Sequence, residues 1–444
     1  MNTKVKTLLL QLLTGLGVAI ALLFASSVTS QLNEFERNVH GGATREPQVA
    51  DPAGAFLEII LESSPLAQLS AGFVGIAPSM HMIRLSATRP LSNLDPIENP
   101  ARRRFGRIDF SFVFLVLMPI ALIPLFYVVY RKCSDRNDLE KLKSGRTKLF
   151  DFAIESILLP LFASGGFIFL VTLACLYSGG IRLGSNELLA RITLWALVIV
   201  SYLLGWMLLF AFLVLRSKAF ASATIWYAAI FLGVVIVLPQ LMQTIQLSIE
   251  RPKGRLPLIV ERRKLMAEVR SDDRAAMDRF LSRQGFKAMN WTEPLPNLQA
   301  LALQNLIIED KISPKLKDFE ANVQRLDNMA IATAWVSPYL VAQIGLDDLA
   351  GTGLTRYSRF RAAAIAYHEQ WRNYALGFVV NRQFFDFDAM RNIPKFKFAD
   401  EELGPILTVA SLRCVYLVLI CLLLGFGVMK ELEKILPKRK KAAR

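Results

Sequence analysis

The sequence predicts an all-α polytopic membrane protein with six transmembrane helices, and composition and pattern both support this fold class. Of its 444 residues 53% are hydrophobic, and the mean hydropathy is +0.37, whereas a soluble protein is roughly 45–50% apolar. The excess lies in six runs of about 20 residues, the length with which a helix crosses ~30 Å of hydrocarbon. Lipid cannot pair with exposed backbone groups, so these runs must be helices. They are Thr7–Val28, Phe110–Tyr130, Ile154–Tyr177, Ile192–Leu215, Phe220–Ile245 and Pro405–Met429.

The first run allows two interpretations. Its apolar core is longer than the roughly 7–15 residues of a signal peptide, so we expect helix 1 to be retained. The alternative is a cleaved signal peptide, since small residues follow the run in the stretch FASSVTS. Cleavage would leave five spans and place the two termini on opposite sides of the membrane.

These spans divide the chain into six parts. The long segment between helices 5 and 6 is large enough to have a core of its own. Neither outer segment contains cysteine, so both must fold without disulfides. The parts are 1–28 (N-terminal tail and helix 1), 29–109 (extracytoplasmic segment), 110–248 (helices 2–5 with the cytoplasmic loop 131–150), 249–404 (extracytoplasmic helical domain), 405–429 (helix 6) and 430–444 (basic cytoplasmic tail).

The distribution of Lys and Arg predicts that both termini are cytoplasmic. Segments 1–6, 131–150, 216–218 and 430–444 together hold 18 basic and 5 acidic residues, whereas 249–404 holds 23 and 20. This is the positive-inside pattern, although the stretch ARRRFGR on the predicted outer side departs from it. The basic excess thus faces anionic lipid headgroups, and we expect no nucleic-acid partner.

Local patterns predict the elements of the outer domain. The stretch IVERRKLMAEVRSDDRAAMDRFLSRQ has apolar residues at helical spacing and predicts one long charged helix. Pro314 predicts a break between two further helices, and Pro239 predicts a kink in the fifth span. In the first outer segment, the alternation in HMIRLSA predicts a short strand.

The stretch WVSPYLVAQIGLDDLAGTGLTRYSRF predicts a corner between two helices of the soluble outer domain. Ser337 and Pro338 suit the N-cap and the first helical position. Gly351, which follows Ala350, suits a left-handed C-cap, and Thr352 or Thr355 can cap the next helix. Leu340, Ile344 and Leu349 can share one face of the first helix, and an aromatic face is expected on the second, made of Phe360, Ala364, Tyr367, Trp371, Tyr374 and Phe378.

Few patterns indicate chemistry. The sequence lacks a GxxxxGK[ST] phosphate loop and an HExxH zinc motif. Its three histidines, at 40, 81 and 368, stand alone, whereas zinc needs three or four ligands. Asp347 and Asp348 are adjacent on a helix and therefore point to different faces. Arg413 is a charge inside the last span: it either lines a substrate path or, as we expect from its closeness to the outer end, extends to the headgroups.

Three blocks of the chain resemble the ABC-2-type permeases, the membrane subunits of ATP-binding-cassette transporters. Block one is PLAQLSAGFVGIAP, from Pro65, and block two is ENPARRRFGRIDFSFVFLVLMPIALIPL. Block three, WVSPYLVAQIGLDDLAGT, is similar to the signature of the branch with an extracytoplasmic domain inserted before the last helix. Its motif residues are Ser337, Pro338, Ala350, Gly351 and Thr352.

This resemblance implies a permease in the bacterial inner membrane, with no cofactor and no enzymatic activity of its own. A separate cytoplasmic ABC ATPase would bind and hydrolyse ATP, and a second permease subunit, identical or similar, would complete the pathway. Loop 131–150 lacks the Gly-Thr pair that such permeases often have. A coupling helix in it would be formed by Asp138, Leu139, Glu140 and Leu142.

Two other function classes compete with the permease. One is a membrane-anchored binding or assembly protein, whose outer domain recruits a partner without transport. The other is a polytopic enzyme, which is disfavoured because the spans lack clustered titratable residues. Substrate and direction of transport cannot be inferred from the sequence.

Overall fold

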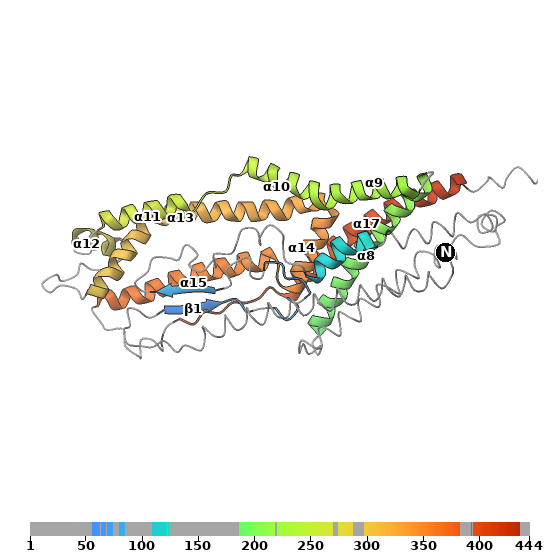
Figure 1. Cartoon of the computed structure of the whole chain (residues 1–444). Coiled ribbons are helices and arrows are strands. Elements are labelled where there is room, and N and C mark those ends of the chain that lie inside the picture. Colours follow the sequence, from blue (N-terminus) through green and yellow to red (C-terminus); the bar gives the residue numbers. More distant parts are fainter. Residues whose placement is uncertain are drawn as a thin grey trace, which may run out of the picture.

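The computed structural model describes residues 56–62, 64–67, 69–73, 80–84, 109–121, 123, 186–217, 220–269, 274–286, 297–381, 392 and 394–435. It is an elongated molecule, with long apolar helices at one end and a mainly helical outer domain at the other (Figure 1). A short helix, α14 (Pro338–Ala350), lies between the two ends. The first and third predicted spans and the loop 131–150 fall outside the described residues.

Three helices among the described residues are long and apolar enough to cross a membrane: Asn186–Arg216, Phe220–Ile249 and Leu403–Glu431. They coincide with the fourth, fifth and sixth predicted spans and confirm that these runs are helical. The first is α8 (Asn186–Arg216). The second comprises α9 (Phe220–Leu232), the π-helical turn η4 (Gly233–Val237) and α10 (Leu238–Ile249). The third lies in α17 (Leu403–Ile435).

The second predicted span is described only in its first part, as a shorter apolar helix, Phe110–Ala121. It begins with α3 (Phe110–Phe112) and continues through a second π-helical turn, η2 (Val113–Leu117). The hydroxyl of Tyr202 on α8 donates to the carbonyl of Leu115 at 3.0 Å, and that of Tyr227 on α9 donates to the carbonyl of Pro119 at 2.9 Å. These bonds join three spanning helices through groups that lipid could not satisfy.

Helices α8 and α17 pack together along most of their length. Small residues permit the close approach: the Cβ position at Gly205 is 3.6 Å from the sulfur of Cys421, and that at Gly427 is 3.4 Å from the ring of Phe212. The thiol of Cys421 also donates to the carbonyl of Ser201 at 3.1 Å. The two helices therefore form a closely packed pair.

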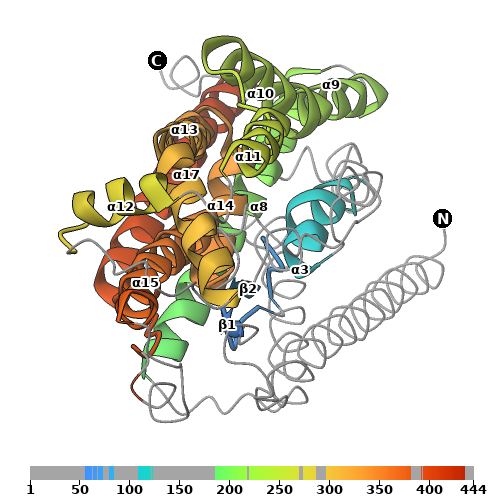
Figure 2. The same cartoon turned by 90° about the vertical axis from the view of Figure 1, so that its left-hand side faces the viewer.

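The outer domain contains α11 (Leu256–Glu268), α12 (Arg274–Arg283), α13 (Asn297–Thr333) and α15 (Leu354–Val380). Viewed from the outer end, these helices lie in front of the spanning helices (Figure 2). They share one buried cluster, in which Phe280, Leu281, Leu303 and Ile308 are at most 1% exposed. The domain therefore has an apolar core separate from that of the spans.

Two helix predictions for this domain are wrong. The expected long charged helix ends at Glu268, because Val269 has an extended backbone (φ −88°, ψ 103°) and is itself buried. The expected break at Pro314 is absent, since α13 runs through this residue. An interior proline costs a helix about 3 kcal/mol or more, but Ile312 and Leu316 on either side are buried in the domain core. Tertiary packing overrides the local preference.

A short strand pair from the first outer segment lies beside the outer domain, and the other described elements are helical, in agreement with the predicted all-α class. Strands β1 (Phe56–Ile60) and β2 (Met80–Arg84) form an antiparallel pair, with Ile59 opposite His81. Strand β2 overlaps the strand predicted in HMIRLSA. Ile59 joins the aromatic face of α15, where Phe360, Ala364, Tyr367 and Trp371 are buried as predicted. The first outer segment therefore packs on the second.

The predicted helix before Gly351 forms as α14, but its expected position in the soluble domain is wrong. Helix α14 packs against α8 and α17, and Ala342, Leu346 and Leu349 share a buried cluster with Trp195 and Val198 of α8. The buried face contains Leu349 but not Leu340 and Ile344, which are half-buried. Small residues at Ala342, Gly345 and Ala350 let α14 approach the spanning helices closely.

Loss of Trp371 should loosen the contact between the strand pair and α15. This side chain is 2% exposed, and truncating a buried Trp typically costs about 3–5 kcal/mol. We expect Trp371→Ala to lower the melting temperature of the purified full chain, followed by circular dichroism. The neighbouring exposed Glu369→Ala is the matched control. Equal melting of both variants would show that the aromatic face does not hold the outer domain together.

Candidate functional site

At the ends of the apolar helices nearest the outer domain lies a set of polar groups, which we call the outer junction after its predicted side of the membrane. It consists of the loop Ser64–Phe73, the start of α3 at Asp109–Ser111, and α14 with the following Gly351 and Thr352. Ser70, Ser111 and Ser337 have no exposed surface, and Thr352 is 4% exposed. Buried polar groups must find partners, and here they find them in one another.

The loop is bound to the end of α14 by backbone and hydroxyl groups. The N–H of Phe73 donates to the carbonyl of Thr352 at 3.0 Å. The hydroxyl of Thr352 donates back to the carbonyl of Ser70 at 2.8 Å. Thr352 therefore binds the loop, rather than serving only as the predicted cap of the next helix.

Two glycines permit this close approach. Gly351 ends α14 in the left-handed region (φ 71°), as predicted, and a Cβ there would lie 2.7 Å from Ser64 Oγ. Gly72 also has a positive φ of 43°, and a Cβ there would lie 2.5 Å from the carbonyl oxygen of Thr352. Gly351 thus faces the loop, and Gly72 faces the end of α14. At both positions a side chain is excluded by the positive φ and by the lack of space.

Asp109 joins the loop to the second span. Its Oδ1 accepts the N–H of Phe112 at 2.8 Å, which caps helix α3, and its Oδ2 accepts the N–H of Ala71 at 2.8 Å. Burial raises the pKa of Asp109 above its ordinary value. The hydrogen bonds from the two N–H groups lower the pKa and so partly oppose the effect of burial. One carboxylate therefore fixes both the helix start and the loop.

Asp347 lies at the centre of the junction. Its Oδ1 accepts a hydrogen bond from the hydroxyl of Ser70 and another, at 3.0 Å, from the amide of Gln343. Ser70 is also hydrogen-bonded to Ser111 of α3. Burial raises the pKa of Asp347 to about 8, and the neighbouring Asp109 and Asp348 add to this, while the bonds from Ser70 and Gln343 oppose it.

Asp348 points away from Asp347, as the helical spacing predicted, and contacts the last span. Its Oδ2 lies 2.5 Å from Nη1 of Arg413, whose side chain is 5% exposed. The expectation that Arg413 extends to the headgroups is therefore wrong. The arginine is held by Asp348 and passes Gly345, where a Cβ would be 3.4 Å from its Cδ.

Ser337 connects α14 to the fifth span. Its hydroxyl accepts the N–H of Leu340 at 3.4 Å, which confirms the predicted N-cap, with Pro338 in the first turn. The same hydroxyl donates to the carbonyl of Val234 in η4 at 3.3 Å. All five residues of the predicted motif, including Ala350 with no exposed surface, thus lie at or beside the junction.

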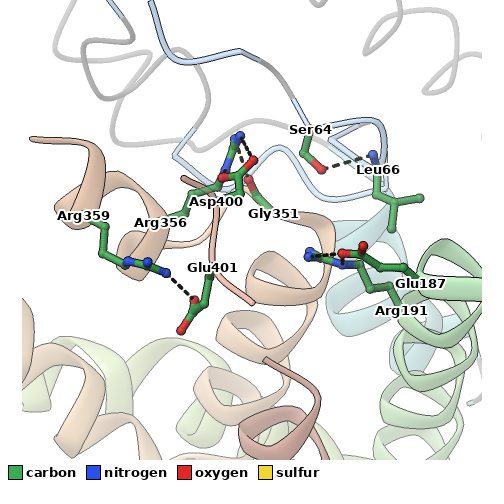
Figure 3. A network of polar contacts seen from close by, with 9 residues as sticks. All are labelled: Ser64, Leu66, Glu187, Arg191, Gly351, Arg356, Arg359, Asp400 and Glu401. Carbon is green, nitrogen blue, oxygen red and sulfur yellow. Dashed lines mark hydrogen bonds and ion pairs between the residues drawn. The ribbon is translucent and has the colours of Figure 1, made fainter. Parts of the chain in front are cut away.

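Ion pairs surround the end of α14 (Figure 3). Arg356 contacts both oxygens of Asp400 at 2.6 and 2.9 Å and also donates to the carbonyl of Gly351 at 3.2 Å. On the other side, Arg191 of α8 pairs with Glu187 at 2.8 Å. Both arginines have mostly buried side chains, at 14% and 13% exposed, so they close the rim of the junction.

Sequence reasoning missed half of this site. Ser70, Asp109 and Ser111 were overlooked because their partners lie in other elements of the fold. Asp109 and Ser111 bond to the loop about 40 residues earlier, and Ser70 bonds to Asp347, 277 residues later. A possible signal was available: Asp109 directly precedes an apolar run, the position of an N-cap. The candidate coupling residues Asp138, Leu139, Glu140 and Leu142 lie outside the described residues.

Within the described part of the chain, no three His, Cys, Asp or Glu side chains are grouped so as to hold a metal ion. His368 lies in the outer domain, where its Nδ1 is 3.5 Å from Glu309. What the junction offers is a set of strong, buried contacts between the outer segments and four apolar helices.

Comparison with known proteins finds a family match for part of the chain. Residues 255–399 match a family model described as a domain of unknown function, DUF3526. The matched residues run from the start of α11 through α14 and α15 and stop before α17. No curated protein and no solved structure matches the chain.

A side chain at Gly351 should force the loop away from α14. A left-handed non-glycine residue costs about 1–2 kcal/mol, and overpacking typically adds about 1–3 kcal/mol. We expect Gly351→Ala to lower the melting temperature of the full chain, and Ser64→Gly in the same chain to restore part of the loss. Ser64→Gly alone is the control. No recovery in the double variant would mean that Ser64 does not press on Gly351.

Proposed function

We propose that this chain is the membrane-spanning permease subunit of an ABC-2-type ATP-binding-cassette transporter. A separate cytoplasmic ATPase would drive it, and it would reside in the bacterial inner membrane with both termini cytoplasmic. A second permease subunit would complete the pathway. Exposed apolar residues of α9 and η4, such as Ile225, Trp226 and Ile236, would provide surface for it alongside lipid.

The observation that carries this proposal is the convergence of the three blocks that resemble the family. Ser70 belongs to the first block, Asp109 and Ser111 to the second, and Asp347 to the third. Their side chains form one hydrogen-bonded network, although Ser70 and Asp347 are 277 residues apart in sequence. Chance similarity in three separate stretches gives no reason for them to meet.

The spanning helices offer a route for mechanical coupling. The packed pair of α8 and α17 runs from its proposed cytoplasmic ends, near Arg216 and Glu431, to the junction. At the junction, α8 carries Arg191 and α17 carries Arg413. Closure of an ATPase on the loop 131–150 would shift the packing of the spans. Because α14 is buried against both α8 and α17, such a shift has to repack α14 and move the outer domain with it.

Coupling through loop 131–150 is tested by two leucines. Leu139 and Leu142 are three residues apart and would present an apolar surface to the ATPase. We expect Leu139→Asp with Leu142→Asp to abolish co-purification of an ABC ATPase encoded beside this gene, with normal membrane insertion. Ser144→Asp with Thr147→Asp is the matched control, since it adds the same charge and keeps the leucines.

Unchanged co-purification and ATPase activity in the leucine variant would remove this loop from the mechanism. If the unaltered chain binds no ABC ATPase, while its outer domain still recruits a partner, the chain is the anchored binding or assembly protein instead.

Orientation is tested by single cysteines at two exposed positions, Ser282 on α12 and Lys434 near the end of α17. The background carries Cys133→Ser and Cys175→Ser and keeps the buried Cys414 and Cys421. In spheroplasts, an impermeant thiol reagent should label Ser282→Cys and spare Lys434→Cys until the membrane is opened. The reverse result would contradict the proposed topology.

A further inference from the structure

The outer junction gathers more acidic than basic charge in a region with little water. Asp109, Asp347 and Asp348 lie within it, and Asp109 and Asp347 are only 5% and 7% exposed. Arg413 is paired with Asp348, and Arg191, on the rim, is paired with Glu187. Because a buried charge is costly without a compensating partner, the three carboxyls are not equivalent.

Their partners distinguish them. Asp109 accepts two backbone N–H groups, one on each oxygen, an arrangement that stabilises a carboxylate. Asp348 has the guanidinium of Arg413. Within the part of the chain that the structure describes, the hydrogen-bond partners of the Asp347 carboxyl are neutral: the hydroxyl of Ser70 and the amide of Gln343.

Other groups around Asp347 do not neutralise it. Tyr339 lies on its own helix, and Asp109 faces it from the start of α3. Arg413 of α17 is directed to the neighbouring Asp348. Asp347 is thus the carboxyl best suited to hold a proton at neutral pH.

The hydrogen bond that Ser70 donates joins this carboxyl to a second segment of the chain. Ser70 is in the docked loop, and the same loop approaches Gly351 and Thr352 without space for a side chain. Lifting the loop would therefore remove the cover from Asp347 and admit water. In water an aspartic acid ionises with its ordinary pKa, near 3.9.

We propose that Asp347 is a proton-dependent latch, neutral while the loop Ser64–Phe73 is docked on α14 and ionised when the loop lifts away. This inference rests on the junction alone and does not require the chain to be a permease. If the chain is a permease, the latch makes movement of its outer domain sensitive to extracytoplasmic pH.

The sign of the effect follows from the two pKa values of Asp347. The docked state has the raised pKa of about 8, and the undocked state has the ordinary value near 3.9. Docking is strongest below about pH 4, where both states hold the proton. Between these values the docked state holds one more proton, so docking weakens with rising pH, at most about tenfold per pH unit. Above about pH 8 there is no further change.

Access to Ala71 reports the opening of the latch. Ala71 is in the docked loop and 5% exposed. The purified full chain carries Cys133→Ser and Cys175→Ser, and a water-soluble maleimide labels a cysteine at position 71 or 282. We measure the labelling rate of Ala71→Cys and divide it by the labelling rate of the exposed Ser282→Cys. This ratio removes the pH dependence of the thiol reaction itself. We expect the ratio to rise from pH 5 to pH 8 and then level off.

Asp347→Asn is the decisive variant, because it is isosteric and permanently neutral. It should keep the ratio low and independent of pH. Asp348→Asn, the matched control on the same helix, should change the ratio but retain its pH dependence. Infrared spectra add a readout independent of labelling: the carboxylic C=O band of the unaltered chain should titrate, and Asp347→Asn should lose it.

Three results would overturn the latch. One is a ratio that does not vary with pH in the unaltered chain. Another is an Asp347→Asn variant that keeps the full pH dependence. The third is loss of the pH dependence in Asp109→Asn but not in Asp347→Asn, which would assign the proton to Asp109.

Discussion

The close approach of the loop Ser64–Phe73 to the end of α14 is the constraint on which the rest of the structure depends. At Gly72 and Gly351 two chain segments occupy the space that a Cβ would fill. This contact brings Ser70 within reach of Asp347 and Thr352, and Ala71 within reach of Asp109. Without it, the buried Asp109 and Asp347 and the hydroxyls of Ser70 and Thr352 would each lose a partner, at a cost of about 1–3 kcal/mol each.

The same contact determines how the outer domain relates to the membrane. A soluble domain tethered by two spans would be free to rotate about its linkers. Here α14 is seated among the outer ends of α8, α17 and η4, and the first outer segment both docks on α14 and adds Ile59 to the face of α15. The outer domain and the spans are therefore joined through packed and hydrogen-bonded contacts, so a change in one must be accommodated by the other.

Local features were predictable from the sequence and long-range ones were not. The caps at Ser337 and Gly351, the aromatic face of α15 and three of the spans follow from signals within one or two helical turns. The course of α13 through Pro314 and the position of α14 depend on packing against distant elements. Asp347 illustrates the limit: its separation from Asp348 follows from helical geometry, whereas its role follows from Ser70, 277 residues earlier.

Two prolines in the spans occupy matching places. Pro119 follows the π-helical turn η2 and Pro239 follows η4, each with one residue between. A proline cannot donate a backbone N–H to the preceding turn, and in lipid a carbonyl left without a donor is costly. In both helices a hydroxyl from elsewhere donates to that turn: Tyr202 to Leu115 and Ser337 to Val234.

Each of these hydroxyls thus supplies a donor to the turn before a proline: Leu115 is four residues before Pro119, and Val234 is five before Pro239. Tyr202 belongs to the fourth span, but Ser337 belongs to the inserted outer region. A carbonyl of the fifth span thus receives its side-chain hydrogen bond from Ser337, a residue 103 positions away and outside the span itself. Exchanging the region between the fifth and sixth spans for another would remove this hydrogen bond, unless the new region supplied a hydroxyl at the same point.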